Sequence, residues 1–434
     1  MRDKYRAAVP VGGQVRQIRT TLVPVIFSVA VLAFVSFAAA EEGDMTAPAE
    51  PPAVTSAEAK PGAADDLFRK GLAAKDRDDY REATRWWREA AELGEIRAML
   101  QLAWVYSRGA SGISRDHPES AKWYRKAAER GNPAAQHSLG VLYRDGQGVP
   151  RDYEQAMLWF QRAAKQGNTS AQSDIGWLYK NGWGVPRDYG EAMEWYRKAA
   201  ERGNPSAQNR IGLLYYYGQG VEGDYRQAMQ WFQKAASQDY PAALFNIGLH
   251  YRYGQGVEQD YVKALQWFSR SADRGYAQAQ YQLGLSYYHG RGTAKDYTQA
   301  MHWFRMAADQ GSLDGQTGVG ILYRDGCGVA QDYAEALRWF RMAAERDNAH
   351  AQYLIGLIYQ KGQGVDQDYR EAMNWFRKSA DRGHIDAAFA VGWLYENGLG
   401  VTEDKANAIE WYRQANALGN GNARQALERL GKIQ

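Results

Sequence analysis

The sequence contains a single cysteine, Cys327, among its 434 residues. An intramolecular disulfide needs two cysteines, so a small fold held together by disulfides is excluded. Cys327 lies between Gly326 and Gly328, in a short connection where comparable segments carry other residues. We interpret it as a neutral substitution at a tolerant position, with a reactive thiol or an intermolecular disulfide as the alternative.

Motifs of catalytic, metal and phosphate sites are also missing. The sequence has no HExxH pair, no GxSxG elbow and no GxxxxGK[ST] loop, and its seven histidines show no metal-ligand spacing. A Gly-x-Gly motif recurs, as at Gly146 and Gly148, but it always separates two predicted helices and is therefore turn chemistry. We predict that the protein is not an enzyme and uses no metal or cofactor, because no set of residues supports a reaction.

An excess of charge of one sign is absent as well. The formal net charge is +3, and residues 1–40 contribute +4 of it through five basic residues and one acidic residue, which leaves −1 for the rest. No basic stripe or arginine-rich arm follows. The composition therefore predicts no nucleic-acid partner.

Only one long apolar run occurs, at residues 22–37, after a basic segment and before three alanines that end at Ala40. This order is typical of a secretory signal peptide, so we expect residues 1–40 to be removed after Ala40 and the protein to be periplasmic. The alternative is an uncleaved inner-membrane anchor facing the periplasm, since residues 20–40 are long enough to span a bilayer. The membrane would then be contacted through this segment alone. Residues 41–63 are rich in Pro, Ala and Glu and are predicted to be a disordered linker.

A strict 36-residue repeat fills most of the chain, with residues 348–383 as its template. In each unit, apolar residues at helical spacing predict a first helix that ends at a glycine such as Gly362. An aspartate such as Asp368, followed three residues later by Glu371, predicts the N-cap of a second helix. A period of this length predicts a solenoid of two-helix units. Units without insertion or deletion start at Asn132, Asn168, Asn204, Tyr240, Tyr276, Ser312, Asn348 and His384.

Two columns of the repeat predict how the helices pack. A glycine recurs in the middle of the first helix, where it costs about 1 kcal/mol relative to alanine, so we expect a neighbouring helix to approach closely there. A tryptophan followed by Tyr or Phe recurs in the second helix, and we interpret it as stacked core rather than as an aromatic ligand site. The glycines are Gly140, Gly176, Gly212, Gly248, Gly284, Gly320, Gly356 and Gly392, and the tryptophans are Trp123, Trp159, Trp195, Trp231, Trp267, Trp303, Trp339, Trp375 and Trp411.

The pattern LG.LY..G.GV..D...A..W(Y/F)..AA..G, seen from Leu283 to Ala308, resembles the Sel-one-like repeat, a relative of the tetratricopeptide repeat. The resemblance covers residues 95–419. It implies an all-α fold, a right-handed superhelical solenoid of about ten helix-turn-helix repeats with a concave face, and a scaffold, adaptor or regulatory role. Some exported members of the family are cysteine-rich, with a disulfide in each repeat. This chain lacks that framework, so hydrolysis of cell-wall or β-lactam compounds is the least favoured alternative.

The predicted organisation has two ends and nine repeats between them. Residues 64–94 form a degenerate, tetratricopeptide-like capping unit, and residues 420–434 begin a C-terminal capping helix. The repeat that starts at Glu95 has one extra residue and carries Ala103 in place of the column glycine. The nine repeats are 95–131, 132–167, 168–203, 204–239, 240–275, 276–311, 312–347, 348–383 and 384–419.

The candidate binding residues follow from the expected stacking, in which the first helices line the concave face. The positions three before the column glycine and one, four and five after it then face the groove. In the middle of the array they form a cluster of tyrosines beside an arginine and a histidine, and Tyr and Arg are favoured binding anchors. Packing between repeats is the alternative. The residues are Leu213, Tyr216, Tyr217, Phe245, Leu249, Arg252, Tyr253, Tyr281, Leu285, Tyr288 and His289.

These observations predict an exported scaffold or regulatory protein that binds a protein partner in the concave groove. The alternative from a different class is a cell-wall or exopolysaccharide binder, in which the tyrosines stack on sugar rings.

Overall fold

The computed structural model describes residues 62–432, and within them the fold is helical, with 21 α-helices and one isolated bridge between Ala110 and Ile113. The prediction of an all-α solenoid is confirmed. The predicted signal peptide at residues 1–40 lies outside the described residues, as does the linker up to residue 61. No helix within residues 62–432 combines the length and the apolar character needed to cross a membrane.

The helices alternate along the chain, and we call the first helix of each unit the A helix and the second the B helix. The A helices are α2 (Ala63–Asp76), α4 (Ile96–Arg108), α6 (Pro133–Asp145), α8 (Thr169–Asn181), α10 (Pro205–Tyr217), α12 (Pro241–Tyr253), α14 (Ala277–His289), α16 (Leu313–Asp325), α18 (Ala349–Lys361) and α20 (Ile385–Asn397). The B helices are α3 (Tyr80–Glu92), α5 (His117–Glu129), α7 (Tyr153–Lys165), α9 (Tyr189–Glu201), α11 (Tyr225–Ala236), α13 (Tyr261–Asp273), α15 (Tyr297–Asp309), α17 (Tyr333–Ala344), α19 (Tyr369–Asp381) and α21 (Lys405–Ala417). A last helix, α22 (Gly421–Arg429), follows α21.

Both helix ends form as the sequence predicts. Gly146 ends α6 in the left-handed conformation, at φ 70° and ψ 31°, and its backbone N–H donates to the carbonyl of Leu142. The side chain of Asp152 then accepts a hydrogen bond from the backbone N–H of Gln155 and caps α7. The second glycine of the connection, Gly148, lies against the preceding B helix, because an added Cβ would be 2.1 Å from the carbonyl oxygen of His117. The first glycine of the Gly-x-Gly motif therefore ends the A helix, and the second allows the connection to pack against the previous unit.

The column glycine admits an aromatic ring of the B helix in its own unit. A Cβ added to Gly284 would lie 2.4 Å from ring atoms of Phe304, which is itself buried. The predicted close approach of a neighbouring helix is thus present, and its partner is the residue that follows the tryptophan. Trp123 and Trp159 are buried, as expected for stacked core, but the other seven tryptophans of the column are only half-buried. Trp231, for example, is half-buried, and the Lys234 ammonium lies 3.9 Å from its ring centroid.

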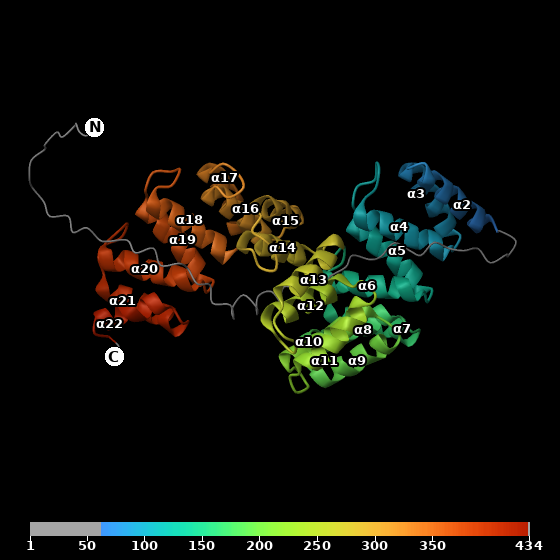
Figure 1. The fold of residues 1–434 in the computed structure, drawn as a ribbon. Coiled ribbons are helices and arrows are strands. Elements are labelled where there is room, and N and C mark those ends of the chain that lie inside the picture. Colours follow the sequence, from blue (N-terminus) through green and yellow to red (C-terminus); the bar gives the residue numbers. More distant parts are fainter. Residues whose placement is uncertain (1–61, 433–434) are drawn as a thin grey trace, which may run out of the picture.

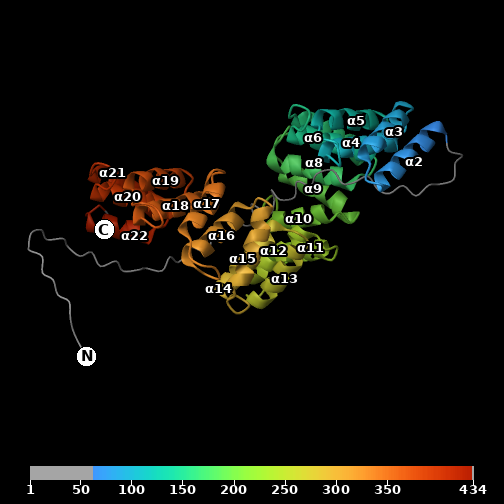
Figure 2. The same ribbon diagram turned by 90° about the horizontal axis from the view of Figure 1, so that it is seen from above.

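Successive helices pack on one another to make a curved array, with α2 and α22 at its opposite ends (Figures 1 and 2). The A helices of neighbouring units also contact one another directly, at α8 with α10 and at α14 with α16. Polar caps link successive A helices as well. The side chain of Asn420, which caps α22, donates a 2.9 Å hydrogen bond to Asp386 at the start of α20. Direct contact between A helices places them on the inner side of the array, where the predicted groove lies.

Candidate functional site

One face of each A helix points away from its B helix, and we call the row of these faces the inner face. In α18 the predicted inner-face positions are Tyr353, Leu357, Gln360 and Lys361, none of which is buried. Their spacing of three or four residues puts them on one side of the helix. The intervening residues of α18 are buried in the core between helices. The face assigned from the repeat pattern is therefore the face that the A helix leaves uncovered.

In the middle of the array, four of the predicted site residues are buried instead: three apolar residues and Arg252, which is 8 % exposed. Leu213 is 2 % exposed, and Phe245 and Leu249 are 0 % exposed, within one core cluster. The ring of Phe245 lies 5.7 Å from that of Phe268 and 5.4 Å from that of Tyr276, between its own B helix and the start of the next unit. These large apolar side chains belong to the core that joins neighbouring units. The prediction that they line an open groove is corrected, and we leave them out of the candidate surface.

Two of the predicted tyrosines connect neighbouring units. The hydroxyl of Tyr216 donates to the side-chain oxygen of Gln255 at 3.0 Å, and its ring lies 5.6 Å from that of His250. The hydroxyl of Tyr288 donates to Asp325 at 3.3 Å. Burial raises the pKa of both hydroxyls to about 12. Both side chains stay half-buried, so each ring packs between units and still contributes to the inner face.

The other predicted residues lie on α12 and α14, apart from Tyr217 at the end of α10. Tyr253 is half-buried, and the Arg252 guanidinium lies 5.6 Å from its ring centroid. The ring of Tyr281 is half-buried against Phe304, at a centroid distance of 5.7 Å. His289 is exposed at the end of α14. Tyr217 and Leu285 are half-buried on the same face. Together with Tyr216 and Tyr288, these residues make up what we call the central surface, and its role in binding stays a prediction.

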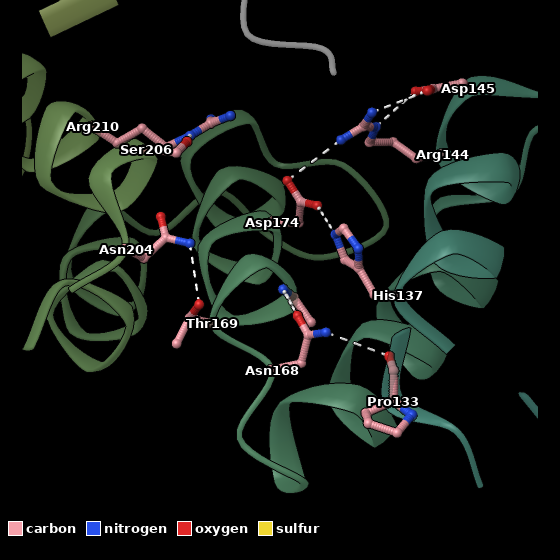
Figure 3. Close-up of polar contacts among 11 residues, drawn as sticks. Pro133, His137, Arg144, Asp145, Asn168, Thr169, Asp174, Asn204, Ser206 and Arg210 are labelled. Atoms are coloured by element: carbon pink, nitrogen blue, oxygen red, sulfur yellow. Dashed lines mark hydrogen bonds and ion pairs between the residues drawn. The ribbon is translucent and has the colours of Figure 1, made fainter. Parts of the chain in front are cut away.

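A polar network on the inner face was not predicted from the sequence (Figure 3). His137 of α6 and Asp174 of α8 are hydrogen-bonded through Nε2 and Oδ2 at 2.8 Å, and Nη1 of Arg144 lies 3.4 Å from the other carboxylate oxygen. Arg144 also forms a two-point ion pair with Asp145, at 2.7 and 3.0 Å. Burial alone would raise the pKa of Asp174, but the hydrogen bond from His137 and the charge of Arg144 lower it overall. The network connects α6 to α8 through hydrogen bonds and through the ion pair of Arg144 with Asp174.

The signal for this network lies in the column two residues before the glycine. That position is buried or half-buried in every repeat, and it carries Asp174, Arg210 and Asn246 in three successive units. The side-chain amide of Asn246 donates to Asn209 at 2.9 Å, again between adjacent A helices. In the last two units the same column carries the apolar residues Leu354 and Ala390. A comparison of the residues at the same repeat position in successive units, rather than of the faces of one helix, would have indicated this network.

A second polar contact joins α18 to the cap of α20. The rings of His350 and His384 are 3.2 Å apart between Nδ1 and Nε2, and the Tyr353 ring stacks on His384 at a centroid distance of 4.6 Å. Burial lowers the pKa of His350 to about 3 and that of His384 to about 4. Both imidazoles are therefore neutral near pH 7 and act as packed ring systems.

The side chains of the inner face are suited to recognition of another molecule. Among residues 62–432, no group of three or more His, Cys, Asp and Glu side chains is arranged to hold a metal ion. The charged groups of the network are fixed by partners on neighbouring helices, and the central surface has partly exposed aromatic rings beside the buried Arg252. Rings and guanidinium groups held on rigid helices are the usual anchors of protein interfaces.

Comparison with known proteins agrees with this architecture. The family model described as Sel1 repeat matches ten consecutive segments, at residues 62–95, 96–132, 133–168, 169–204, 205–240, 241–276, 277–312, 313–348, 349–384 and 385–420. The first of these covers the unit predicted to be a degenerate, tetratricopeptide-like cap. No curated protein sequence matched the chain.

Two solved structures are similar to the chain over most of their own length. One is c5321, a protective antigen of uropathogenic Escherichia coli strains with an SLR fold, at 34 % identity over 92 % of this chain and 82 % of that one, with a TM-score of 0.55. The other is a Sel1 repeat protein from Oxalobacter formigenes, at 36 % identity over 58 % of this chain and 99 % of that one, with a TM-score of 0.52.

Proposed function

The chain belongs to the Sel1 repeat family, whose fold is a scaffold for protein interactions, and from this premise we propose that it binds a protein partner on its inner face outside the cytoplasm. The observation that carries the proposal is that some repeat positions keep their residue type from unit to unit and others do not. The packing columns keep the same residue types from unit to unit, whereas the positions four and five after the glycine change chemistry. They carry Arg144 and Asp145 in one unit but Tyr216 and Tyr217 two units later. Variation at the positions that face outward from the A helices is what a scaffold uses to select its partner.

The proposal places the binding anchors on the central surface. Tyr253, Tyr281 and Tyr288 are half-buried there, so each ring offers an open edge or face on a side chain that packing already holds in place. Pre-ordered rings lose little conformational entropy on binding. The proposal that the protein is exported rests on the sequence before residue 41, in which a basic segment is followed by an apolar run and then by alanines. N-terminal sequencing of protein from its own host would separate cleavage after Ala40 from an uncleaved anchor.

Site-specific photo-crosslinking in the source organism tests the proposal. A benzophenone amino acid at Tyr253 or Tyr288, on the inner face, is expected to give one discrete heavier product that contains a second protein. The same amino acid at Gln299, exposed on B helix α15, is the matched control and is expected to give none. Equal products from both faces would contradict an inner-face site. Crosslinks to saccharide alone, with retention on peptidoglycan or exopolysaccharide, would favour the polysaccharide alternative.

A further inference from the structure

Three A helices carry an arginine at the same repeat position, four residues after the column glycine. They are Arg144 of α6, Arg252 of α12 and Arg324 of α16. The residue that follows is Asp145 in the first case and Asp325 in the third, but Tyr253 in the second. Position and backbone are therefore equivalent, and only the neighbour that could supply a negative charge differs.

The two arginines followed by aspartate are neutralised by it. Arg324 binds Asp325 through two contacts, of 2.7 Å from Nε and 2.9 Å from Nη2, and Arg144 binds Asp145 in the same way. Paired hydrogen bonds of this kind are the strong geometry of a guanidinium with a carboxylate. The pKa of each arginine is raised, because the aspartate outweighs the opposing effect of burial. The chain itself thus shows which counter-ion fits this position.

Arg252 is buried without such a counter-ion. Its side chain is 8 % exposed, and within residues 62–432 it hydrogen-bonds to the neutral side chain of Gln282 and forms no ion pair. Asp314 acts electrostatically on Tyr281 nearby but is not paired with Arg252. Burial lowers the pKa of Arg252, in contrast to the other two arginines. A buried charge without an opposite charge is costly, so the position calls for an anion from outside.

The surroundings of Arg252 add positive charge. Arg291 lowers the pKa of Arg252 further, and burial followed by the charges of Arg291, Arg252 and Lys295 lowers the pKa of His289 to about 4. Arg291 and Lys295 are exposed in the connection after α14, whereas His289, with its pKa lowered to about 4, is neutral near pH 7 and adds no charge. The two exposed cations make an open rim of positive potential around a buried guanidinium, which steers anionic groups toward it.

We propose that Arg252 receives a carboxylate of the bound protein partner, supplied by an acidic side chain or by the C-terminus. The inference rests on the proposed function and specifies the chemistry of the partner. The incoming carboxylate takes the place that Asp145 and Asp325 occupy beside Arg144 and Arg324, and Tyr253 and Tyr281 flank it. The absence of an aspartate after Arg252 thus leaves a place for the carboxylate of the partner.

Synthetic peptides on the full chain test the proposal. Three peptides of otherwise identical sequence serve as probes. The first has two internal glutamates and an amidated C-terminus, and the second has glutamines at these positions and a free C-terminal carboxylate. The third, neutral peptide has the glutamines and an amidated C-terminus. Wild type is expected to bind a carboxylate-bearing peptide about thirtyfold more tightly than the neutral one, and the better of the first two peptides identifies the source. Arg252→Met should remove this preference. Arg324→Met, the matched control at an arginine already paired, should keep it.

A second pair of variants separates charge from folding. Tyr253→Asp supplies the internal aspartate that the other units have, and Tyr253→Asn makes the same cavity without the charge. The carboxylate preference should survive in Tyr253→Asn and be lost in Tyr253→Asp. Equal affinity of wild type for all three peptides, an unchanged preference in Arg252→Met, or identical behaviour of the two Tyr253 variants would each overturn the inference. A crosslinked partner whose affinity does not change in Arg252→Met would overturn the inference and leave the proposed function intact. A carboxylate preference without any protein crosslink would instead contradict the proposed function, and with it the protein source of the carboxylate, while Arg252 would still be a carboxylate site.

Discussion

Replacing Phe268 with alanine is expected to lower the free energy of unfolding by about 3–5 kcal/mol, the usual cost of emptying a buried aromatic site. Phe268 is 1 % exposed, and an added Cβ on Gly248 would lie 2.5 Å from its ring, so helix and ring leave no room for water or for repacking. Trp267→Ala is the matched control, because the neighbouring ring is only half-buried. Its cost should be clearly smaller. Chemical denaturation of the three proteins measures both values.

The loss should also be local. Each unit contacts mainly the units before and after it, so stability is nearly a sum over units and their interfaces. In Phe268→Ala, hydrogen-exchange protection should fall in α12, α13 and the helices next to them and persist in α2–α5 and α18–α21. Uniform loss of protection from residue 95 to residue 419 would show that the array unfolds as one cooperative body.

The second large effect is expected at the column glycine. Gly284→Leu should cost about 3 kcal/mol or more, since even the Cβ would lie 2.4 Å from the Phe304 ring and overpacking at this depth displaces a helix. Gly190→Ala is the matched control at a helical glycine that is not enclosed, because the nearest atom to its added Cβ is the Asp188 cap at 3.2 Å. That change should be neutral or stabilising by up to about 1 kcal/mol.

Thermal or urea unfolding of the two glycine variants decides the point. Both substitutions reduce the conformational entropy of the unfolded chain, which stabilises both variants. This effect therefore cannot explain why one variant is destabilised and the other is not. Equal midpoints would mean that the glycine column does not mark a helix contact.

The features predicted correctly from the sequence are those that one unit determines by itself. Gly146 as a C-cap, Asp152 as an N-cap and the uncovered face of α18 all follow from residues a few positions apart. The period then repeats these local results along the chain. The architecture therefore follows from the sequence alone.

The features that were missed depend on contacts between units. Leu213, Phe245 and Leu249 occupy face positions, yet they are buried in a core cluster that extends across neighbouring units. The pairing of His137 with Asp174 joins residues 37 positions apart in sequence. The distance between adjacent A helices depends on which side chains meet there. It cannot be predicted from the spacing of residues within one unit.

The central claim is that the inner face binds a protein through the central surface, and equilibrium affinity for the crosslinked partner tests it most directly. Titration calorimetry would compare wild type with Tyr253→Ala/Tyr288→Ala, in which two anchors are removed and the buried Phe245 and Phe268 are kept. The account predicts a loss of affinity of at least about thirtyfold, with an unchanged helical circular dichroism spectrum. Unchanged affinity in a folded double variant would contradict it and place the binding site on another part of the solenoid.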